Sequence, residues 1–230
     1  TRRRADAMGL EDMGTAAQVA AEAGVVISVC PPAAALDTAR SLDRFSGVYV
    51  DANAISPSTA AKVGSLVTRA GATFVDGGLV GRPPQRRGDV RLYLSGVDAG
   101  TVAELFDGSA VEVRVLGEEI GKASSLKCAY AAWTKGTIAL LLAVHRYARA
   151  SGTEDALLEE WTESLPDLQE RLERSAASAH AKGWRWIAEM REIAEAFESL
   201  GLPRGFHAAA ADIFTLPLPG ALPGTGEGDQ

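Results

Sequence analysis

The sequence predicts an α/β fold in which a parallel sheet comes first and an all-helical domain follows, joined by one long helix. Three observations predict this arrangement. Short β-branched runs alternate with helical patterns over the first half of the chain, strand signals stop after about residue 116, and helix formers then dominate. Near-continuous apolar strands separated by helices are typical of βαβ units, which place parallel strands side by side.

Five segments have strand character: Val25–Cys30, Gly47–Asp51, Thr73–Asp76, Val90–Leu94 and Val111–Val115. The helical patterns in this half are Met13–Glu22, Ala33–Arg40, Pro57–Arg69 and Ala99–Phe106. Pro57 follows Ser56, and a proline at the first helical position after a serine cap is a strong signal for a helix start. These elements make up a predicted first domain over residues 1–117.

The second domain is predicted to be helical over residues 118–215. Its first helix covers residues 118–150, interrupted only by Gly121 and Gly136, and would span about 50 Å. A helix of that length bridges two domains or packs against a partner subunit, which predicts a homodimer. Further helices are predicted to begin at Glu154, Leu165, Gly183 and Arg204. The Pro- and Gly-rich tail, residues 216–230, is predicted to be disordered.

Composition excludes several classes of function. The 230 residues include 30 acidic and 23 basic side chains, for a net charge of −7, and an acidic chain is a poor general binder of nucleic acid. No run of about 18 apolar residues exists, so no membrane span is expected. Cys30 and Cys128 cannot form a disulfide framework, and no leader is visible after Thr1. We therefore expect a cytoplasmic protein whose partner is a small molecule.

A parallel sheet invites a search for a dinucleotide-binding fingerprint. The glycine-dense match, Gly224 to Gly228, follows no predicted strand and opens no helix, so it does not qualify. The sequence also holds no Walker loop, no paired-histidine metal motif and no nucleophile elbow. No metal site is predicted.

Two polar segments follow predicted strands, at the sheet edge where α/β proteins bind ligands. The first, Asp51–Pro57, combines short polar side chains with a helix N-terminus, although an ordinary N-cap is the commoner explanation. The second, Asp76–Pro84, holds three glycines within five residues, which would let a ligand approach the backbone; a loop that needs positive φ is the alternative. The following arginines could bind an anionic substrate or phosphate, or could form a solvated basic loop: Arg82, Arg86 and Arg87.

The third segment, Gly121–Gly136, places Lys127 in a run of otherwise apolar and aromatic residues. Only five of the 23 basic residues are lysines, and three of those five fall in this segment. Arginine does not lose its proton at working pH, whereas burial lowers the pKa of a lysine. Lys127 is therefore a candidate general acid/base, with a lysine reaching to solvent from a helix edge as the alternative.

In this order and spacing, the segments resemble motifs of the β-hydroxyacid dehydrogenase family, the relatives of 6-phosphogluconate and 3-hydroxyisobutyrate dehydrogenases. Val29–Pro32 resembles the family's cofactor-contacting turn, and Asp51–Pro57 its D-x-S-T-x-x-P segment. Asp76–Arg82 resembles the D-A-P-V-S-G-G substrate loop. Gly121–Ala131 resembles the G-x-G-x-x-x-K-x-x-x-N helix, whose catalytic lysine falls on Lys127.

The C-terminal half resembles one bacterial branch of the same family. The segments that carry this likeness are Trp184–Ile193 and Gly201–Leu202, with a lysine-bearing helix of the S-x-L-K-x-x-Y-A-A form. The resemblance implies a truncated Rossmann-like parallel sheet followed by an all-α C-terminal domain joined by a long interdomain helix. It also implies an NAD(P)-dependent oxidoreductase that transfers a hydride between nicotinamide and a small hydroxy-acid-like substrate.

The resemblance also implies roles for individual residues, with Lys127 as the catalytic acid/base. The implied substrate contacts are Asn53, Gly78, Val80, Gly81, Ser124, Tyr130 and Ala131. The implied contacts to NADP or NAD are Cys30, Pro31, Pro32, Asn53 and Ala54. Three tryptophans could wall an apolar pocket, although core packing is their commoner role: Trp133, Trp184 and Trp186.

Several positions depart from the family pattern. The family's substrate-loop serine falls on Val80, its asparagine one turn after the lysine on Ala131, and the threonine of the first segment on Ala54. Ser124 and Tyr130, three residues either side of Lys127, could reach the same space.

Glu189 and Glu192 lie one turn apart on a later helix and could act as the acid partner of Lys127, although exposed helix glutamates are common. The apolar replacements keep an imine-reducing relative open as an alternative function. A non-catalytic helical dimerisation protein with a degraded nucleotide fold is the other alternative.

The largest departure is at the front of the chain. The family begins with a strand, a G-x-G-x-x-G turn, a helix and a second strand, and none of these precedes the first predicted elements. We therefore expect a fragment, or a chain that lost its start, with an unpaired edge on both neighbours of a missing central strand. Arg2–Arg4 would lie near an adenosine 2′-phosphate, which slightly favours NADP over NAD, although a solvated first turn is the more economical interpretation.

Overall fold

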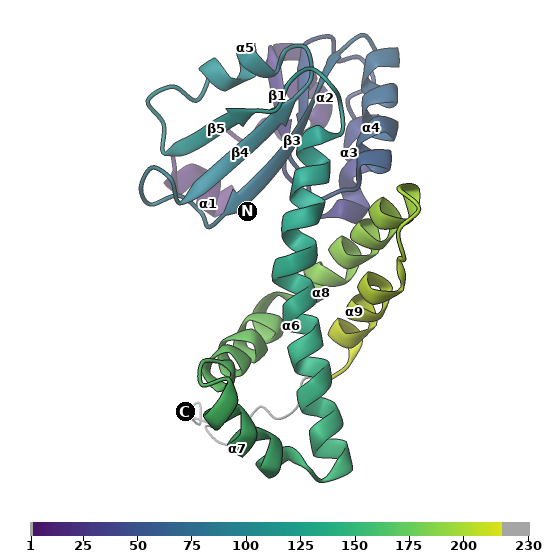
Figure 1. Cartoon of the computed structure of the whole chain (residues 1–230). Helices are drawn as coiled ribbons and strands as arrows, with labels where there is room; N and C mark the ends of the chain where they lie inside the picture. The colour runs from purple at the N-terminus through teal and green to yellow at the C-terminus, as the bar shows by residue number, and fades with distance from the viewer. Residues whose placement is uncertain (1, 218–230) are drawn as a thin grey trace. The chain divides into compact units, whose positions relative to one another are not determined.

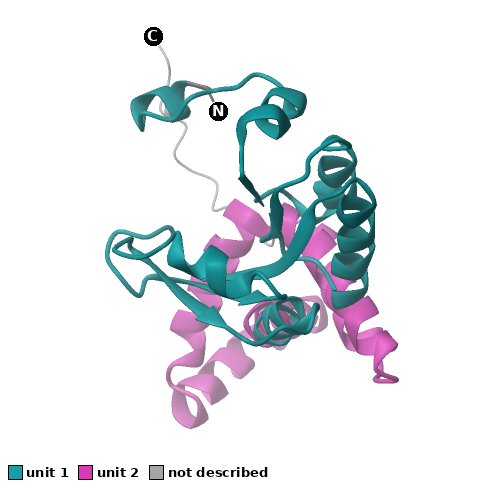
Figure 2. Ribbon diagram, turned by 90° about the horizontal axis from the view of Figure 1, so that it is seen from above, with its two compact units in different colours: residues 1–130 teal, residues 131–230 magenta. Residues whose placement is uncertain are grey.

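Figure 1 shows the computed structural model of the chain, which describes residues 2–217. These residues divide into two compact units, Thr1–Tyr130 and Ala131–Gln230, coloured separately in Figure 2. The division falls inside helix α6 (Lys122–Ser151) rather than at the predicted residue 117. The first turns of α6 belong to unit 1 because they are bonded to its sheet.

Unit 1 contains all five strands that the sequence predicts. They form one sheet in the order β1-β2-β3-β4-β5, with the bounds β1 (Val25–Ser28), β2 (Val48–Asp51), β3 (Thr73–Gly81), β4 (Val90–Ser95) and β5 (Val111–Val115). β1, β2 and β3 are parallel, as predicted, and β4 is parallel to β5.

The prediction of a wholly parallel sheet is wrong at one junction, since β4 runs antiparallel to β3. β3 continues through Gly81, where it pairs with Val90, so the segment 76–81 that we expected to be a loop is strand. The link from Arg82 to Asp89 is short, and a parallel crossover needs about a dozen residues or more. A hairpin is therefore the connection that this length allows.

The expected gap in the middle of the sheet is also absent. The five strands pair in unbroken sequence order, so the outer edges among the described residues lie at β1 and β5. β1 leaves Ile27 and Val29 largely exposed. The two unpaired edges flanking a missing central strand do not occur.

Helices cover both faces of this sheet (Figure 1). α3 (Ala35–Arg40) and α4 (Pro57–Arg69) pack on one face and α5 (Ala99–Glu104) on the other. The remaining helical elements of unit 1 are α1 (Arg2–Ala7), α2 (Ala16–Glu22) and the 3-10 turn η1 (Pro32–Ala34). Ser56 caps α4 by accepting a hydrogen bond from the Thr59 amide at 3.2 Å, which confirms the predicted helix start. Adjacent β2 residues enter different apolar clusters: Tyr49 packs with the α3–α4 side and Val50 with the α5 side. Apolar packing on both faces buries β2 and fixes its register.

Unit 2 is all-helical, as predicted. It contains the later turns of α6, then α7 (Glu154–Ser164), α8 (Leu168–Ser199) and α9 (Gly205–Thr215). α6 begins at Lys122 rather than Glu118 because Gly121 adopts a positive φ of +96°, and its 30 residues span about 45 Å. The helices expected from Leu165 and Gly183 are one helix, α8, in which Gly183 packs against α9.

Most of the predicted disordered tail lies outside the described residues, as does the glycine cluster at 224–228. Across residues 2–217, none of the helices combines the length and the apolar character that a membrane crossing requires.

Candidate active site

Asp76 is the centre of the hydrogen-bond network that joins the sheet to α6. It lies in β3, and its carboxylate is fully buried. The Oδ2 atom accepts bonds from the amides of Gly121 and Ser124, each at 3.0 Å, and from the Ser95 hydroxyl at 3.2 Å. The Oδ1 atom accepts a bond from the Ser124 hydroxyl. One carboxylate therefore ties β3, β4 and the first turn of α6 together.

This arrangement satisfies amides that a helix start leaves without partners. The Ser95 hydroxyl also accepts a bond from the Ala123 amide at 3.2 Å, so three N–H groups around the first turn are paired. A carboxylate at a helix N-terminus interacts favourably with the helix dipole. Burial raises the pKa of Asp76, and the hydrogen bonds from Ser124, Ser95 and Gly121 oppose that rise.

Lys127 lies on α6 one turn beyond Ser124, half-buried against β3. Its Nζ atom donates a hydrogen bond to the Leu79 carbonyl at 2.5 Å. Burial lowers the pKa of Lys127 below its ordinary value, and no carboxylate contributes to the shift. The amine is thus held on a rigid helix, bonded to a strand backbone, in a setting that disfavours its charge.

Glycine at position 78 allows α6 to lie this close to β3. A Cβ there would lie 3.0 Å from the Ala123 carbonyl oxygen and 3.1 Å from the Lys127 Cβ. Gly77 packs in the same way against β2, where a Cβ would lie 2.7 Å from the Asp51 carbonyl oxygen. Neighbouring protein atoms therefore explain these glycines, whereas we expected them to admit a ligand. Gly81 has the predicted positive φ, +125°.

Asn53 organises a second cluster at the carboxyl ends of β1 and β2. Its Oδ1 atom accepts a bond from the Cys30 amide at 2.5 Å, and its Nδ2 donates to Ser28 Oγ and Asp51 Oδ2, each at 3.0 Å. Both amide hydrogens of Asn53 are therefore donated within the protein. These bonds fix the Cys30–Pro32 turn after β1, in which Pro31 is exposed. Ala54, directly after Asn53 in the chain, is half-buried.

The other predicted substrate residues have varied settings. Val80 is buried in β3, and Ser124 is fully buried with its hydroxyl donated to Asp76. Tyr130 is exposed at the end of unit 1, and Ala131 is buried at the start of unit 2. In unit 1 the structure thus brings Lys127, Gly78 and Ser124 together.

In unit 2, Glu189 forms an ion pair with Lys135, and both side chains are 15% exposed. Of the two glutamates considered as acid partners for Lys127, Glu189 is therefore paired with a different lysine. Trp186 is buried and packs edge-on against Phe214, with 5.2 Å between the ring centroids, so it belongs to the core. Trp133 and Trp184 are mostly exposed.

Sequence reasoning missed the role of Asp76 as an anchor and missed Ser95 altogether. Asp76 stood only as the first residue of a presumed ligand loop. The available signal was a polar residue at the end of one predicted strand, Asp76, and another directly after the next, Ser95, followed downstream by Gly121 near the start of the predicted long helix. Among the described residues, no cluster of three or more His, Cys, Asp or Glu side chains could hold a metal ion.

The chain is similar in sequence and structure to several known proteins. The profile of a domain of unknown function, DUF1932, matches residues 148–216. A conserved hypothetical protein from Sinorhizobium meliloti has a similar structure, with TM-score 0.69 and 29% identity over 93% of this chain and 73% of that one. The conserved protein MTH1747, described as structurally similar to 3-hydroxyacid dehydrogenases, gives TM-score 0.64 and 32% identity over 94% of this chain and 82% of that one.

An uncharacterised 28.5 kDa protein of Methanothermus fervidus is 33% identical over 136 residues. That match covers 59% of this chain and spans only about half, 52%, of the relative's length.

Two enzymes share the fold at lower identity. The 3-hydroxyisobutyrate dehydrogenase of Salmonella typhimurium has TM-score 0.62 and 16% identity, over 87% of this chain and 76% of that one. A reductive aminase of Aspergillus terreus, solved with NADPH, has TM-score 0.55 and 15% identity, over 94% of this chain and 81% of that one.

Replacing Asp76 tests the anchor. Asp76→Ala leaves several buried donors without an acceptor, so we expect the free energy of unfolding to fall by about 3–5 kcal/mol. Asp76→Asn keeps the shape of the side chain but places an NH2 group next to those donors. We expect the free energy of unfolding to fall for this variant as well. Chemical denaturation followed by circular dichroism measures both.

The matched control is Asp37→Ala, which removes an exposed carboxylate paired with Arg40 and should cost under about 1 kcal/mol. Equal losses for Asp76→Ala and Asp37→Ala would show that the carboxylate does not anchor α6.

Proposed function

The chain belongs to the β-hydroxyacid dehydrogenase family, and from that premise we propose that it is an NAD(P)-dependent oxidoreductase with Lys127 as its general acid/base. The substrate is a small hydroxy-acid-like molecule that is oxidised at a CH–OH group, or formed by the reverse reduction. The observation that carries the proposal is the half-buried Lys127 amine, held on α6 and bonded to the Leu79 carbonyl.

The chemistry follows from the state of this amine. Because burial lowers the pKa of Lys127, a larger share of the side chain is neutral at working pH than for an exposed lysine. The neutral amine can take the hydroxyl proton while the carbon loses a hydride, and the ammonium returns a proton to the oxygen in reduction. The Leu79 carbonyl positions Nζ by accepting a hydrogen bond from it. The hydrogen bonds to Asp76 hold the first turn of α6 in place.

The turn after β1 is suited to the nicotinamide end of NAD or NADP. Pro31 and the largely exposed Val29 offer an apolar surface at the carboxyl end of a parallel strand, the usual ligand edge of such sheets. Asn53 fixes this turn through the Cys30 amide. When bound, the nicotinamide supplies the hydride donor or acceptor. Cys30, Pro31, Pro32 and Ala54 would hold it, with no pyrophosphate-binding glycine turn among residues 2–217.

A second candidate is reduction of an imine. The fold is shared with a reductive aminase, and the apolar residues Val80 and Ala131 stand where the family pattern has a serine and an asparagine. Such an enzyme would reduce cyclic imines and leave hydroxy acids unchanged, which separates the two activities directly.

We also propose that the helical unit forms a homodimer through α6. Trp133, Leu140 and Tyr147 recur every seven residues along it and are 69%, 51% and 75% exposed. An apolar stripe of this spacing is typical of a helix that packs against another helix.

Lys127→Ala is the direct test of the acid/base assignment. With NADH or NADPH and a panel of hydroxy acids and cyclic imines, turnover should fall by about 10²- to 10⁴-fold, and Lys127→Arg should not restore it. The protein should include any residues that the gene encodes before Thr1. Lys122→Ala, which removes an exposed lysine paired with Glu119, is the control and should keep full activity. Unchanged turnover in Lys127→Ala would refute the assignment.

The lowered pKa of Lys127 also predicts a pH dependence of stability. Between the folded-state pKa and the usual 10.5, the unfolded chain binds more protons than the folded chain, so the free energy of unfolding rises with pH in that window. Denaturation of the native chain and Lys127→Met at pH 8 to 10.5 should show this extra rise only in the native chain. Parallel curves would mean that Lys127 titrates normally.

Leu140→Asp tests the homodimer by placing a charge in the middle of the stripe. We expect sedimentation to change from dimer to monomer, because a buried unpaired carboxylate is costly. Leu200→Asp is the control: this side chain is 78% exposed at the end of α8, outside the stripe. A native chain that sediments as a monomer would contradict the proposal.

A further inference from the structure

The hairpin between β3 and β4 is strongly basic in an acidic chain. Within residues 82–89 there are three arginines and one acid, Asp89, whereas the whole chain has a net charge of −7. Glu112 on β5 is the neighbouring acid, and it forms a two-bond contact with Arg114. The hairpin therefore keeps an excess of positive charge.

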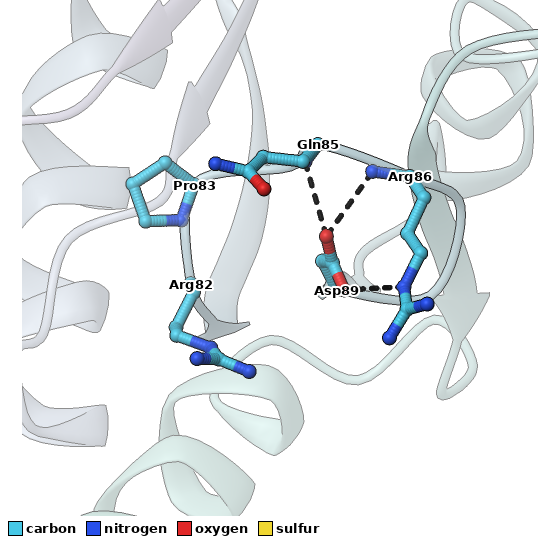
Figure 3. Close-up of a pocket in the computed structure, with 5 residues that line it drawn as sticks. All are labelled: Arg82, Pro83, Gln85, Arg86 and Asp89. Carbon is cyan, nitrogen blue, oxygen red and sulfur yellow. Dashed lines mark hydrogen bonds and ion pairs between the residues drawn. The ribbon is translucent and has the colours of Figure 1, made fainter.

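A pocket of about 440 Å³ lies in this hairpin, wholly within unit 1. Its lining residues are Arg82, Pro83, Gln85, Arg86 and Asp89, drawn in Figure 3. In that view the side chains of Arg82 and Arg86 extend to the same side of the loop backbone, with Asp89 between them.

Asp89 stabilises the loop by accepting hydrogen bonds from its backbone amides. Its Oδ2 atom accepts hydrogen bonds from the amides of Gln85 and Arg86, each at 3.1 Å, and its carbonyl accepts one from the Arg82 amide at 3.1 Å. The two amide bonds to its carboxylate hold the pKa of Asp89 below its usual value, so the carboxylate stays charged. Its Oδ1 atom lies 3.5 Å from Arg86 Nε. No ion pair within 4.0 Å is formed by Arg82 or Arg87 among the described residues, and they act on Asp89 and Glu112 only at longer range, where they lower the pKa of each carboxyl.

The pocket is close along β3 to the candidate acid/base. Lys127 is bonded to Leu79, and Arg82 follows three residues later, about 10 Å along an extended strand. The long side chain of Arg82 can reduce this distance. The pocket and the Leu79–Lys127 bond therefore belong to β3 and the loop that directly follows it.

We propose that this pocket binds an oxyanion, a phosphate or carboxylate carried by the substrate at the end remote from its reacting carbon. Arg82 and Arg86 are the binding residues, since a guanidinium fork matches the oxygens of both groups. That the oxyanion belongs to the substrate rests on the proposed function, whereas anion binding itself does not.

The test is a titration of the chain with inorganic phosphate at constant ionic strength, following the arginine Nε–Hε signals by NMR. We expect saturable shifts for Arg82 and Arg86. Arg82→Gln, which changes an exposed side chain, should weaken phosphate binding by about tenfold. Arg40→Gln is the matched control, because the exposed Arg40 is paired with Asp37 on α3, outside the pocket lining, and this variant should bind phosphate as the native chain does.

Shifts that never saturate, or an equal loss in Arg40→Gln and Arg82→Gln, would overturn the site. Separate titrations with NAD⁺ and NADP⁺ identify the source of the oxyanion: Arg82 signals that respond only to NADP⁺ would assign the pocket to the cofactor and overturn the substrate assignment. None of these measurements requires turnover, so loss of the Lys127 assignment would leave the result for the pocket unaffected.

Discussion

A single buried carboxylate sets the position of the candidate acid/base. Asp76 accepts bonds from Gly121, Ser124 and Ser95, and so fixes the start of α6 against β3 and β4. Lys127 follows within the next turn and can reach the Leu79 carbonyl only if that start is held. Burying a charge is costly unless its hydrogen bonds are made, which explains why two amides and two serine hydroxyls all donate to its two oxygens. The position of the Lys127 amine is thus set by Asp76 on β3.

The sequence predicts the elements of the fold better than their pairing. Five strands and an all-helical second half follow from β-branched runs and helix formers, and the Ser56–Pro57 start follows from cap chemistry. The antiparallel β4 was missed because glycines were interpreted as loop, whereas Gly77, Gly78 and Gly81 continue β3. Glycine allows both a free loop and a closely packed strand, and only the neighbouring atoms distinguish them.

The candidate site was partly predictable for a similar reason. Lys127 stood out because a lysine in an apolar helical run is unusual in an arginine-rich chain. The partners of Asn53, Ser124 and Glu189 could not be predicted, since they lie from 23 to 54 residues away: Cys30, Asp76 and Lys135. Contacts over such separations depend on the strand order and on helix packing. A single sequence carries no direct signal for them.

The central claim is that the fold holds Lys127 as an amine that loses its proton more easily than an exposed lysine. The most direct measurement is an NMR titration of the Lys127 side chain, with its Cε carbon labelled and its signal identified by Lys127→Met. The account predicts a midpoint below the ordinary lysine value of 10.5. A Lys127 midpoint at or above 10.5 would contradict the account.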